Sequence, residues 1–227
     1  MIPYTIIHID SRAKKHIKRT KEKLRGFNYT NRIPFFDGRK SDGRKVLEKK
    51  EIFLNWKPYD GRTTDPLPSE FGVWVSNVRV YEYIVKKQLD RFLILEDDVI
   101  VCDAFLTLFP LILEEIPADF DFVSLYSFDF DNEPSEETEM SLNYLQRSFN
   151  QHAAFQGMIF SHSGARRVLE ILKTDGIEYT NDCMVYEKAR EGKLTGYSLR
   201  KDVKILSHDM SIASTIDTTG IRMEGVH

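Results

Sequence analysis

Two hydrophobic patterns alternate along the chain and predict its secondary structure. Short, continuous apolar runs are typical of buried strands, whereas apolar positions spaced by three and four residues are typical of amphipathic helices. Strands are predicted at 4–9, 33–36, 91–95, 120–126, 153–160 and 203–206. Longer helices are predicted at 70–85 and 104–116. Because strands and helices alternate, the pattern indicates an α/β fold.

Capping signals place further helices. Asp10 follows the first strand as a candidate N-cap, and a basic helix is predicted from there to about Gly26. Ser161 similarly precedes a helix that runs to Leu172, and Asp182 stands at the start of another helix.

Three polar stretches interrupt this pattern. Residues 39–68 are rich in Gly, Pro, Lys and Asp, and we predict that they form a long excursion outside the core. Residues 129–148 are acidic and polar, so we expect a loop that either closes over a ligand as a lid or has no role. Residues 207–227 form a weakly patterned polar tail that could close the same ligand site.

Composition agrees with one folded domain over 1–227. Of the 227 residues, 41% are hydrophobic and 30% are charged, so the chain is too apolar for disorder and too charged for an integral membrane protein. No apolar run approaches the ~18–20 residues of a membrane-spanning helix, and the N-terminus lacks the pattern of a secretion signal. With two cysteines, we expect a reducing, cytoplasmic location.

The charge balance argues against nucleic-acid binding. Lys and Arg total 32 against 35 acidic residues, a net charge of −3, which provides no excess positive field. Residues 12–25 are nevertheless strongly basic, and they form either a solvated helix face or a phosphate-facing surface. Peripheral contact with an anionic membrane stays open, although no hydrophobic anchor supports it.

Three acidic residues, Glu96, Asp97 and Asp98, follow the apolar run at 91–95. Burial of an unpaired carboxylate is unfavourable, so a cation is expected beside them. If the chain stays extended, Glu96 and Asp98 share one side and Asp97 points to the other. Oxygen ligands of this kind suit Mg²⁺ or Mn²⁺. The alternative is an acidic turn that caps the next helix.

Five short motifs occur in a fixed order between about residues 5 and 185. They are IHIDSR at 7–12, FDG at 36–38, EFGVWVSN at 70–77, LEDD at 95–98 and GMIFSHSGA at 157–165. These motifs and their order resemble glycosyltransferase family 25, which includes lipopolysaccharide-type and collagen galactosyltransferases. One position departs from the family pattern, because Asn77 replaces a histidine and asparagine cannot carry a proton near pH 7.

The resemblance implies a single Rossmann-like fold of the GT-A nucleotide-diphospho-sugar transferase type, with a central mixed, mostly parallel sheet. It also implies a metal-dependent, inverting transfer of a sugar, galactose, from a UDP-sugar to a hydroxyl of a glycan or other acceptor. Mn²⁺ or Mg²⁺ would be the cofactor. The alternative is a non-catalytic sugar-binding or scaffold module of the same fold, for which Asn77 is the sequence support.

Three residues are candidates for the metal site. Asp98 is the principal ligand, and Glu96 contacts either the metal through water or the ribose. His208 could supply a neutral imidazole from the C-terminal segment, as in GT-A enzymes, or have a structural role. The metal would neutralise the leaving diphosphate.

The donor-binding candidates lie mainly at the ends of the first strands. They are Ile9, Asp10, Arg12, Asp37, Gly38, Ser76, Glu96, Asp97 and Gly157. Several have a structural alternative: Asp10 as an N-cap, Asp37 and Gly38 as a plain turn, and Arg12 as an exposed residue of the basic helix. Gly157 either allows close approach of a sugar or relieves strand crowding.

An inverting transfer needs a base that removes the proton of the acceptor hydroxyl. Asp182 is the candidate, because it resembles the family's aspartate in this region, and its alternative is a helix N-cap. Glu70 and Asp97 are the reserve candidates.

Overall fold

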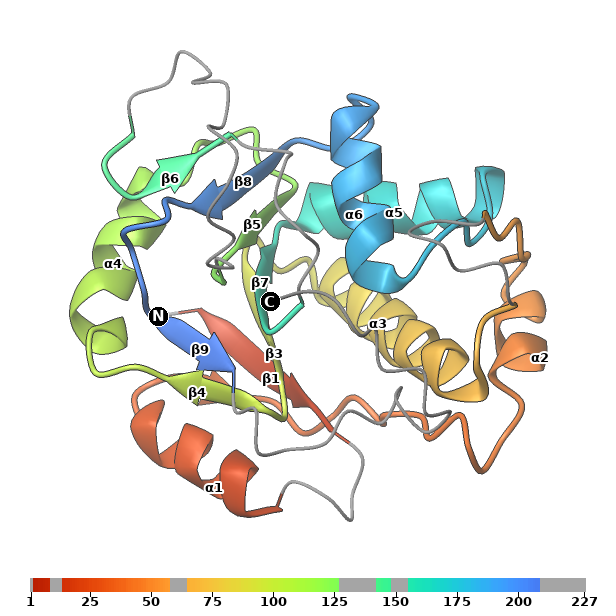
Figure 1. The fold of residues 1–227 in the computed structure, drawn as a ribbon, viewed down its shortest axis with the longest axis horizontal. Coiled ribbons are helices and arrows are strands. Elements are labelled where there is room, and N and C mark those ends of the chain that lie inside the picture. Colours follow the sequence, from red (N-terminus) through yellow and green to blue (C-terminus); the bar gives the residue numbers. More distant parts are fainter. Residues whose placement is uncertain (1, 9–13, 58–64, 127–141, 148–154, 209–227) are drawn as a thin grey trace, which may run out of the picture.

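The computed structural model describes residues 2–8, 14–57, 65–126, 142–147 and 155–208. Its main sheet is made of β1 (Pro3–Ile7), β2 (Asn28–Tyr29), β3 (Phe92–Glu96), β5 (Phe122–Ser124), β6 (Leu145–Gln146), β7 (Gly157–Phe160) and β8 (Gly196–Leu199). These seven strands lie in the order β2-β1-β3-β7-β5-β8-β6 (Figure 1). Within the described residues, β6 and β7 run against the other five strands of the sheet. The expected α/β fold with a mixed, mostly parallel sheet is confirmed.

Helices cover both faces of this sheet. They are α1 (Lys14–Lys23), α2 (Gly43–Glu48), α3 (Pro68–Lys87), α4 (Phe105–Glu115), α5 (His162–Thr174) and α6 (Asn181–Arg190). A separate two-stranded antiparallel sheet pairs β4 (Val99–Val101) with β9 (Leu206–His208). In Figure 1, α1, α4 and this small sheet lie on one side, and α2, α3, α5 and α6 lie on the other.

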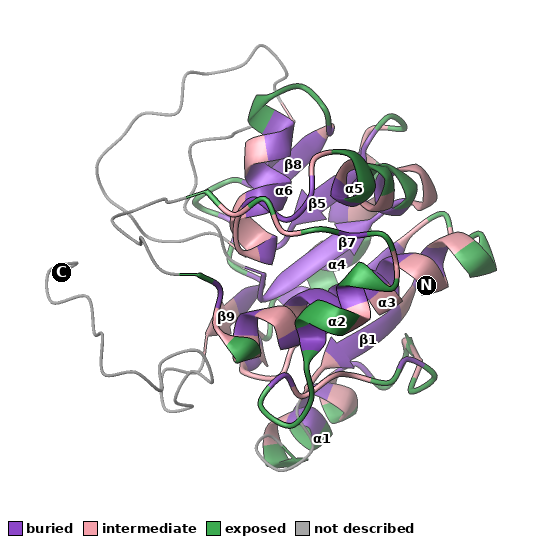
Figure 2. Ribbon diagram, turned by 90° about the vertical axis from the view of Figure 1, so that its right-hand side faces the viewer, coloured by how far each residue is buried: buried purple, intermediate pink, exposed green. Residues whose placement is uncertain are grey.

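The sheet separates two hydrophobic cores because side chains alternate along each strand. In β3, Leu93 and Leu95 join the core with α1 and α4, whereas Phe92 and Ile94 join the core with α3, α5 and α6. Figure 2 shows the central strands as buried and the helices as buried on their inward sides. β3 is therefore covered on both faces, as its continuous apolar sequence predicts.

Helix α3 begins at a sequence signal and ends at a residue with positive φ. Pro68 occupies its first turn, where a missing N–H is tolerated, and the Glu70 carboxylate accepts a hydrogen bond of 2.7 Å from the Leu67 N–H. At the other end, Gln88 adopts the left-handed conformation with φ of 52° and stops the helix. The helix predicted at 70–85 is confirmed.

The strand predicted at 33–36 is wrong. The second strand is β2, a two-residue strand that pairs in parallel with β1. Pro34 lacks an N–H for a strand ladder, and the Phe36 N–H donates to the Ser76 Oγ at 3.0 Å, not to a neighbouring strand. The segment therefore runs along α3 as an irregular connection.

The prediction that 39–68 stays outside the core is also wrong for its described part. Helix α2 forms there, with Asp42 as its N-cap, and it packs on α3. Leu47 and Ile52 are both buried in the core. A short helix with one apolar side has too few positions for a periodic pattern to appear.

Two strands were missed in the C-terminal half. β6 lies inside the stretch predicted as a loop at 129–148, of which 142–147 is described, and Leu145 is buried. β8 begins at Gly196, where an added Cβ would lie 2.2 Å from the Phe122 ring.

The strand predicted at 203–206 is β9, shifted towards His208. Of the tail at 207–227, residues 209–227 lie outside the described residues.

No helix among the described residues is long and apolar enough to cross a membrane.

Candidate functional site

The acidic cluster lies at the C-terminal end of β3. Glu96 is the last residue of the strand, and Asp97 and Asp98 form the turn into β4. The side-chain alternation expected for an extended chain is therefore wrong beyond Glu96. Burial raises the pKa of Glu96 well above its usual value, and the charges of Asp98, Asp182 and Asp97 raise it further. The charge of Asp182 in α6 therefore acts on Glu96, although the two residues come from different elements.

His208 reaches this cluster from the far end of the sequence. β9 pairs with β4 so that His208 stands opposite Val99. The His208 Nε2 consequently lies 3.1 Å from the Asp98 Oδ2, although the two residues are 110 positions apart. Both side chains are partly buried.

The donor atoms of Asp98 and His208 fit part of a metal site. The Asp98 Oδ1 is buried and accepts no hydrogen bond from any described residue, which is costly for a carboxylate without a cation. The Asp98 carboxylate and the His208 ring nitrogen, which are hydrogen-bonded to each other in this structure, would be the protein ligands. Within the described ranges, no group of three or more His, Cys, Asp or Glu side chains is arranged to hold an ion. Water or substrate phosphate would have to complete the shell.

Asp182 lies in the first turn of α6 and is free of the capping role considered for it. The N-cap of α6 is Thr180, two residues earlier. The Asp182 Oδ1 accepts a hydrogen bond of 2.9 Å from the Cys183 N–H. One turn later, burial raises the pKa of Tyr186 to about 12, and the charge of Asp182 contributes to the increase.

Helix α3 fixes the start of α6 with two hydrogen bonds. The Trp74 Nε1 donates to the Tyr179 carbonyl at 3.1 Å, and the Tyr81 hydroxyl lies 3.2 Å from the Asn181 Oδ1. Trp74 and Tyr81 are both fully buried. The sequence places Trp74 and Tyr81 in a predicted helix but does not reveal these bonds, because the partners lie about 100 residues away.

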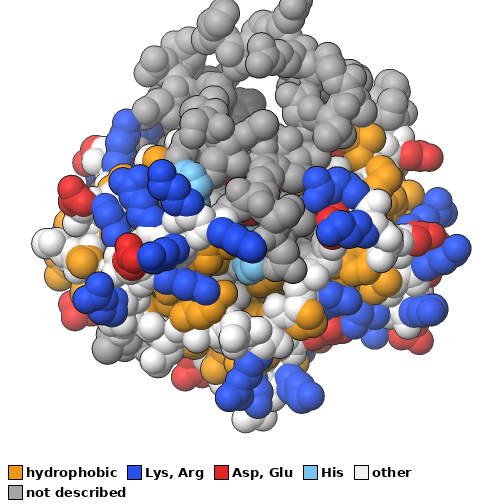
Figure 3. All heavy atoms as spheres, turned by 90° about the horizontal axis from the view of Figure 1, so that it is seen from below, with side chains coloured by type: hydrophobic (Ala, Val, Ile, Leu, Met, Phe, Trp, Pro, Cys, Tyr) orange, Lys and Arg blue, Asp and Glu red, His pale blue; other side chains and the backbone are white. Residues whose placement is uncertain are grey.

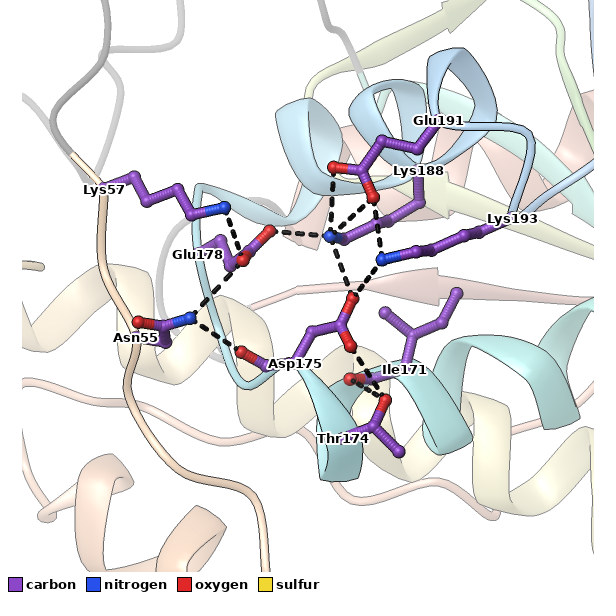
Figure 4. A network of polar contacts seen from close by, with 9 residues as sticks. All are labelled: Asn55, Lys57, Ile171, Thr174, Asp175, Glu178, Lys188, Glu191 and Lys193. Carbon is purple, nitrogen blue, oxygen red and sulfur yellow. Dashed lines mark hydrogen bonds and ion pairs between the residues drawn. The ribbon is translucent and has the colours of Figure 1, made fainter.

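A cluster of charges, here called the Lys188 cluster, holds the rest of α6 (Figure 4). It consists of Lys57, Asp175, Glu178, Lys188, Glu191 and Lys193. The Lys188 Nζ lies 2.6 Å from Glu178 and 3.0 Å from each of the other two carboxylates. Burial opposes the charge of Lys188, but the hydrogen bonds of these carboxylates outweigh burial and raise its pKa. The cluster therefore fixes the helix that carries Asp182.

A cavity of about 310 Å³ lies where β1 and β2 end. It is lined by His8, Tyr29, Asn31, Ile33, Pro34, Phe35, Asp37 and Lys40. The Arg39 guanidinium donates to both oxygens of Asp37 at 2.9 and 3.0 Å, and these hydrogen bonds lower the pKa of Asp37 to about 2. Because β1 lies beside β3 in the sheet, the cavity and the carboxylate cluster share one edge.

Comparison with known families identifies the chain. The sequence profile of "Glycosyltransferase family 25 (LPS biosynthesis protein)" matches residues 1–185. The chain belongs to glycosyltransferase family 25. A comparison with curated proteins finds no match to this family 25 chain.

Two solved structures are similar to this family 25 glycosyltransferase. The crystal structure of A197 from STIV has 12% sequence identity and a TM-score of 0.44, covering 91% of this chain and 83% of that one. The crystal structure of a glycosyltransferase involved in the glycosylation of the major capsid of PBCV-1 has 13% identity and a TM-score of 0.33, covering 84% of this chain and 67% of that one.

Two donor-binding candidates of this family 25 chain have packing roles. An added Cβ at Gly38 would lie 1.8 Å from the Pro68 carbonyl oxygen, so glycine lets this segment approach the start of α3. The buried Ser76 accepts from the Phe36 N–H at 3.0 Å and donates to the Gly72 carbonyl at 2.8 Å. Both residues position the wall of the cavity that contains Asp37.

Gly157 and Glu70 are likewise engaged in structure. Gly157 is buried opposite Leu95, and a Cβ there would lie 2.2 Å from the Leu206 Cδ1. Of its two proposed roles, the structure supports relief of crowding, which lets β9 approach β7. Glu70 is buried at the start of α3 and accepts from the Leu67 N–H. Candidates Ile9, Asp10 and Arg12 lie outside the described residues.

Asn77, the departure from the family pattern, lies in the middle of α3. Its side chain has no exposed surface, and its Nδ2 donates to the Val73 carbonyl at 3.1 Å. Its Oδ1 is buried and has no hydrogen-bond partner among the described residues.

Proposed function

We propose that this family 25 glycosyltransferase moves a sugar, galactose, from a UDP-sugar to a hydroxyl of a glycan or other acceptor, with inversion and with Mn²⁺ or Mg²⁺. The observation that carries the proposal is the 3.1 Å approach of His208 to Asp98 beside Glu96, at the edge where β1 and β3 end. The charge of Asp182 from α6 also acts on Glu96. Ligands of open α/β sheets bind at this edge.

The cavity at the end of β1 is the proposed seat of the donor nucleotide. Phe35 lines this cavity and supplies an aromatic ring on which a base can stack. Asp37 stays ionised there because Arg39 is bound to it, so it can accept hydrogen bonds but not donate them.

Asp98 and His208 would hold the metal, with Glu96 beside them as a ligand through water or as a contact to the ribose. When bound, the metal supplies positive charge that stabilises the leaving diphosphate. The unsatisfied Asp98 Oδ1 supports this assignment, since it lacks a hydrogen-bond donor among the described residues. The raised pKa of Glu96 supports it too, because a nearby cation would relieve the repulsion among the carboxylates.

Asp182 would remove the proton of the acceptor hydroxyl as that oxygen attacks the sugar carbon. Its carboxylate is suited to this task because it is not the N-cap of α6 and is only partly buried. Attack from the face opposite the leaving diphosphate gives inversion. Hydrogen bonds from α3 and the Lys188 cluster keep Asp182 in place.

A screen of nucleotides tests the donor assignment. The melting temperature of the protein is measured in Mn²⁺ with UDP, CDP, GDP or ADP, and a ligand at 100 times its Kd should stabilise the fold by about 2.7 kcal/mol. UDP should give the largest increase, and UDP-galactose a larger one than UDP-glucose. An increase with GDP or ADP but not with UDP would refute the donor assignment.

A further inference from the structure

A second cavity, of about 520 Å³, runs along α1. Its polar and charged lining residues are His8, Lys14, Lys18, Lys21, Glu22 and Arg25. Four of these side chains are cationic and one is acidic. Figure 3 shows Lys and Arg side chains gathered on the face of the molecule that includes α1.

Few acidic side chains pair with the cations of this cavity. Within the described residues, Lys14, Lys21 and Arg25 form no ion pair, and Lys18 lies 4.0 Å from Glu22 in an exposed pair. The Lys21 Nζ instead lies 3.7 Å from the centre of the Tyr29 ring. Positive charge is concentrated here although the whole chain carries a net charge of −3. The cavity therefore favours an anionic ligand.

The position of the cavity relates it to the proposed donor site. His8 lines both cavities. Lys21 of the α1 cavity also lies over the ring of Tyr29, which lines the donor cavity. A group bound along α1 would thus lie beside the donor nucleotide without taking the place of its base.

We propose that the cavity along α1 binds a phosphate or diphosphate group of the acceptor, so that the acceptor is a phosphorylated glycan. This inference rests on the proposed function, because it assigns the acceptor of the same reaction. Several cations facing one cavity suit a ligand with two or more negative charges, and phosphate oxygens accept hydrogen bonds from lysine and arginine. A neutral glycan would bring no negative charge to these cations.

Two matched double variants test the proposal. Lys14→Gln with Lys18→Gln removes two charges that line the cavity, whereas Lys15→Gln with Arg19→Gln removes two exposed charges from the same turns that do not line it. Calorimetry of the full chain measures inorganic pyrophosphate binding in chelator and, separately, UDP binding in Mn²⁺. The cavity variant should weaken pyrophosphate binding about tenfold or more, and the control by no more than about threefold. UDP affinity should stay within about twofold in both variants.

Several results would overturn the proposal. Equal loss of pyrophosphate binding in both variants would mean that the net charge of α1, not the cavity, attracts the anion. Binding of the protein to phosphatidylglycerol vesicles that weakens equally in both variants would identify a membrane-facing surface. A parallel loss of UDP affinity in the cavity variant would assign the cavity to the donor diphosphate.

The test also separates this proposal from the proposed function. If the wild-type protein fails to bind UDP, the donor assignment is wrong, but the pyrophosphate comparison still decides whether the anion site exists.

Discussion

Replacement of Lys188 by methionine tests how firmly α6 is held. Methionine keeps most of the side-chain volume and removes the charge. Lys188 is 2% exposed, and Glu178, its closest partner at 2.6 Å, is 5% exposed. The substitution therefore leaves a buried carboxylate with one cation fewer.

The loss of stability can be estimated from this geometry. Removal of one partner of a buried ion pair costs about 3–5 kcal/mol. Each carboxylate of the Lys188 cluster keeps one other lysine, either Lys57 or Lys193, within 2.9 Å. We therefore expect a loss near the lower end, about 3 kcal/mol, which lowers the Tm of a chain of this size by roughly 6–12 °C.

The loss should depend on pH. Burial acts to raise the pKa of Glu178, but hydrogen bonds from Lys188 and Lys57 outweigh it and lower that pKa. A carboxylate with a lowered folded-state pKa contributes stability above its unfolded pKa of about 4.3 and loses it as the pH falls through the folded value. The difference between wild type and Lys188→Met should be widest near pH 7 and narrow below about pH 4.

Urea unfolding at pH 7 and at lower pH measures both effects. Lys173→Met is the matched control, because Lys173 forms an exposed ion pair of 3.2 Å with Glu51. The control should change the free energy of unfolding by less than about 0.5 kcal/mol. Equal stability of wild type and Lys188→Met at pH 7, or a difference between them that does not change with pH, would refute the reasoning.

Three further substitutions test the site and its packing. Asp182→Asn should leave UDP affinity within about twofold and lower the transfer rate by about 10²-fold or more, and a variant that keeps a tenth of the wild-type rate would exclude Asp182 as the base. Glu96→Gln should raise the Tm of the metal-free protein at pH 7 and raise it less at pH 5. The reason is that the pKa of Glu96 is raised in the folded protein, so its ionised form destabilises the fold at higher pH. An unchanged Tm at pH 7 would contradict this. Gly157→Ala should cost about 1 kcal/mol in urea unfolding, since its Cβ would lie 2.2 Å from the flexible end of Leu206, and an unchanged stability would show that the contact relaxes freely.

The elements that the sequence predicts well are those with long or continuous patterns. Helix α3 shows the helical repeat over 20 residues, and β3 is a run of apolar residues that ends at Glu96. The place of the acidic cluster follows from the same pattern, because the acids stand at the C-terminal end of a buried strand. Short elements were missed or misplaced, since α2 and β2 are fixed by contacts with α3 and β1 and not by local pattern.

The geometry of the site depends on contacts between distant parts of the chain. The resemblance to family 25 suggested Asp98 and His208 as ligands, but their 3.1 Å contact depends on the pairing of β4 with β9. The sequence also suggested Asp182 as an N-cap, whereas the helix begins two residues earlier at Thr180. The support of α6 by Lys188 could not be predicted, because its partners come from the turn before the helix and from its C-terminal end.

UDP binding to the Asp98→Ala variant tests the central proposal most directly. Calorimetry compares wild type in Mn²⁺, wild type in chelator, Asp98→Ala in Mn²⁺, and Asp202→Ala as a control at an exposed carboxylate. The proposal predicts that wild type and Asp202→Ala bind UDP in Mn²⁺, and that chelator and Asp98→Ala each weaken binding at least tenfold. Equal UDP affinity in all four measurements would contradict a metal-dependent donor site at Asp98.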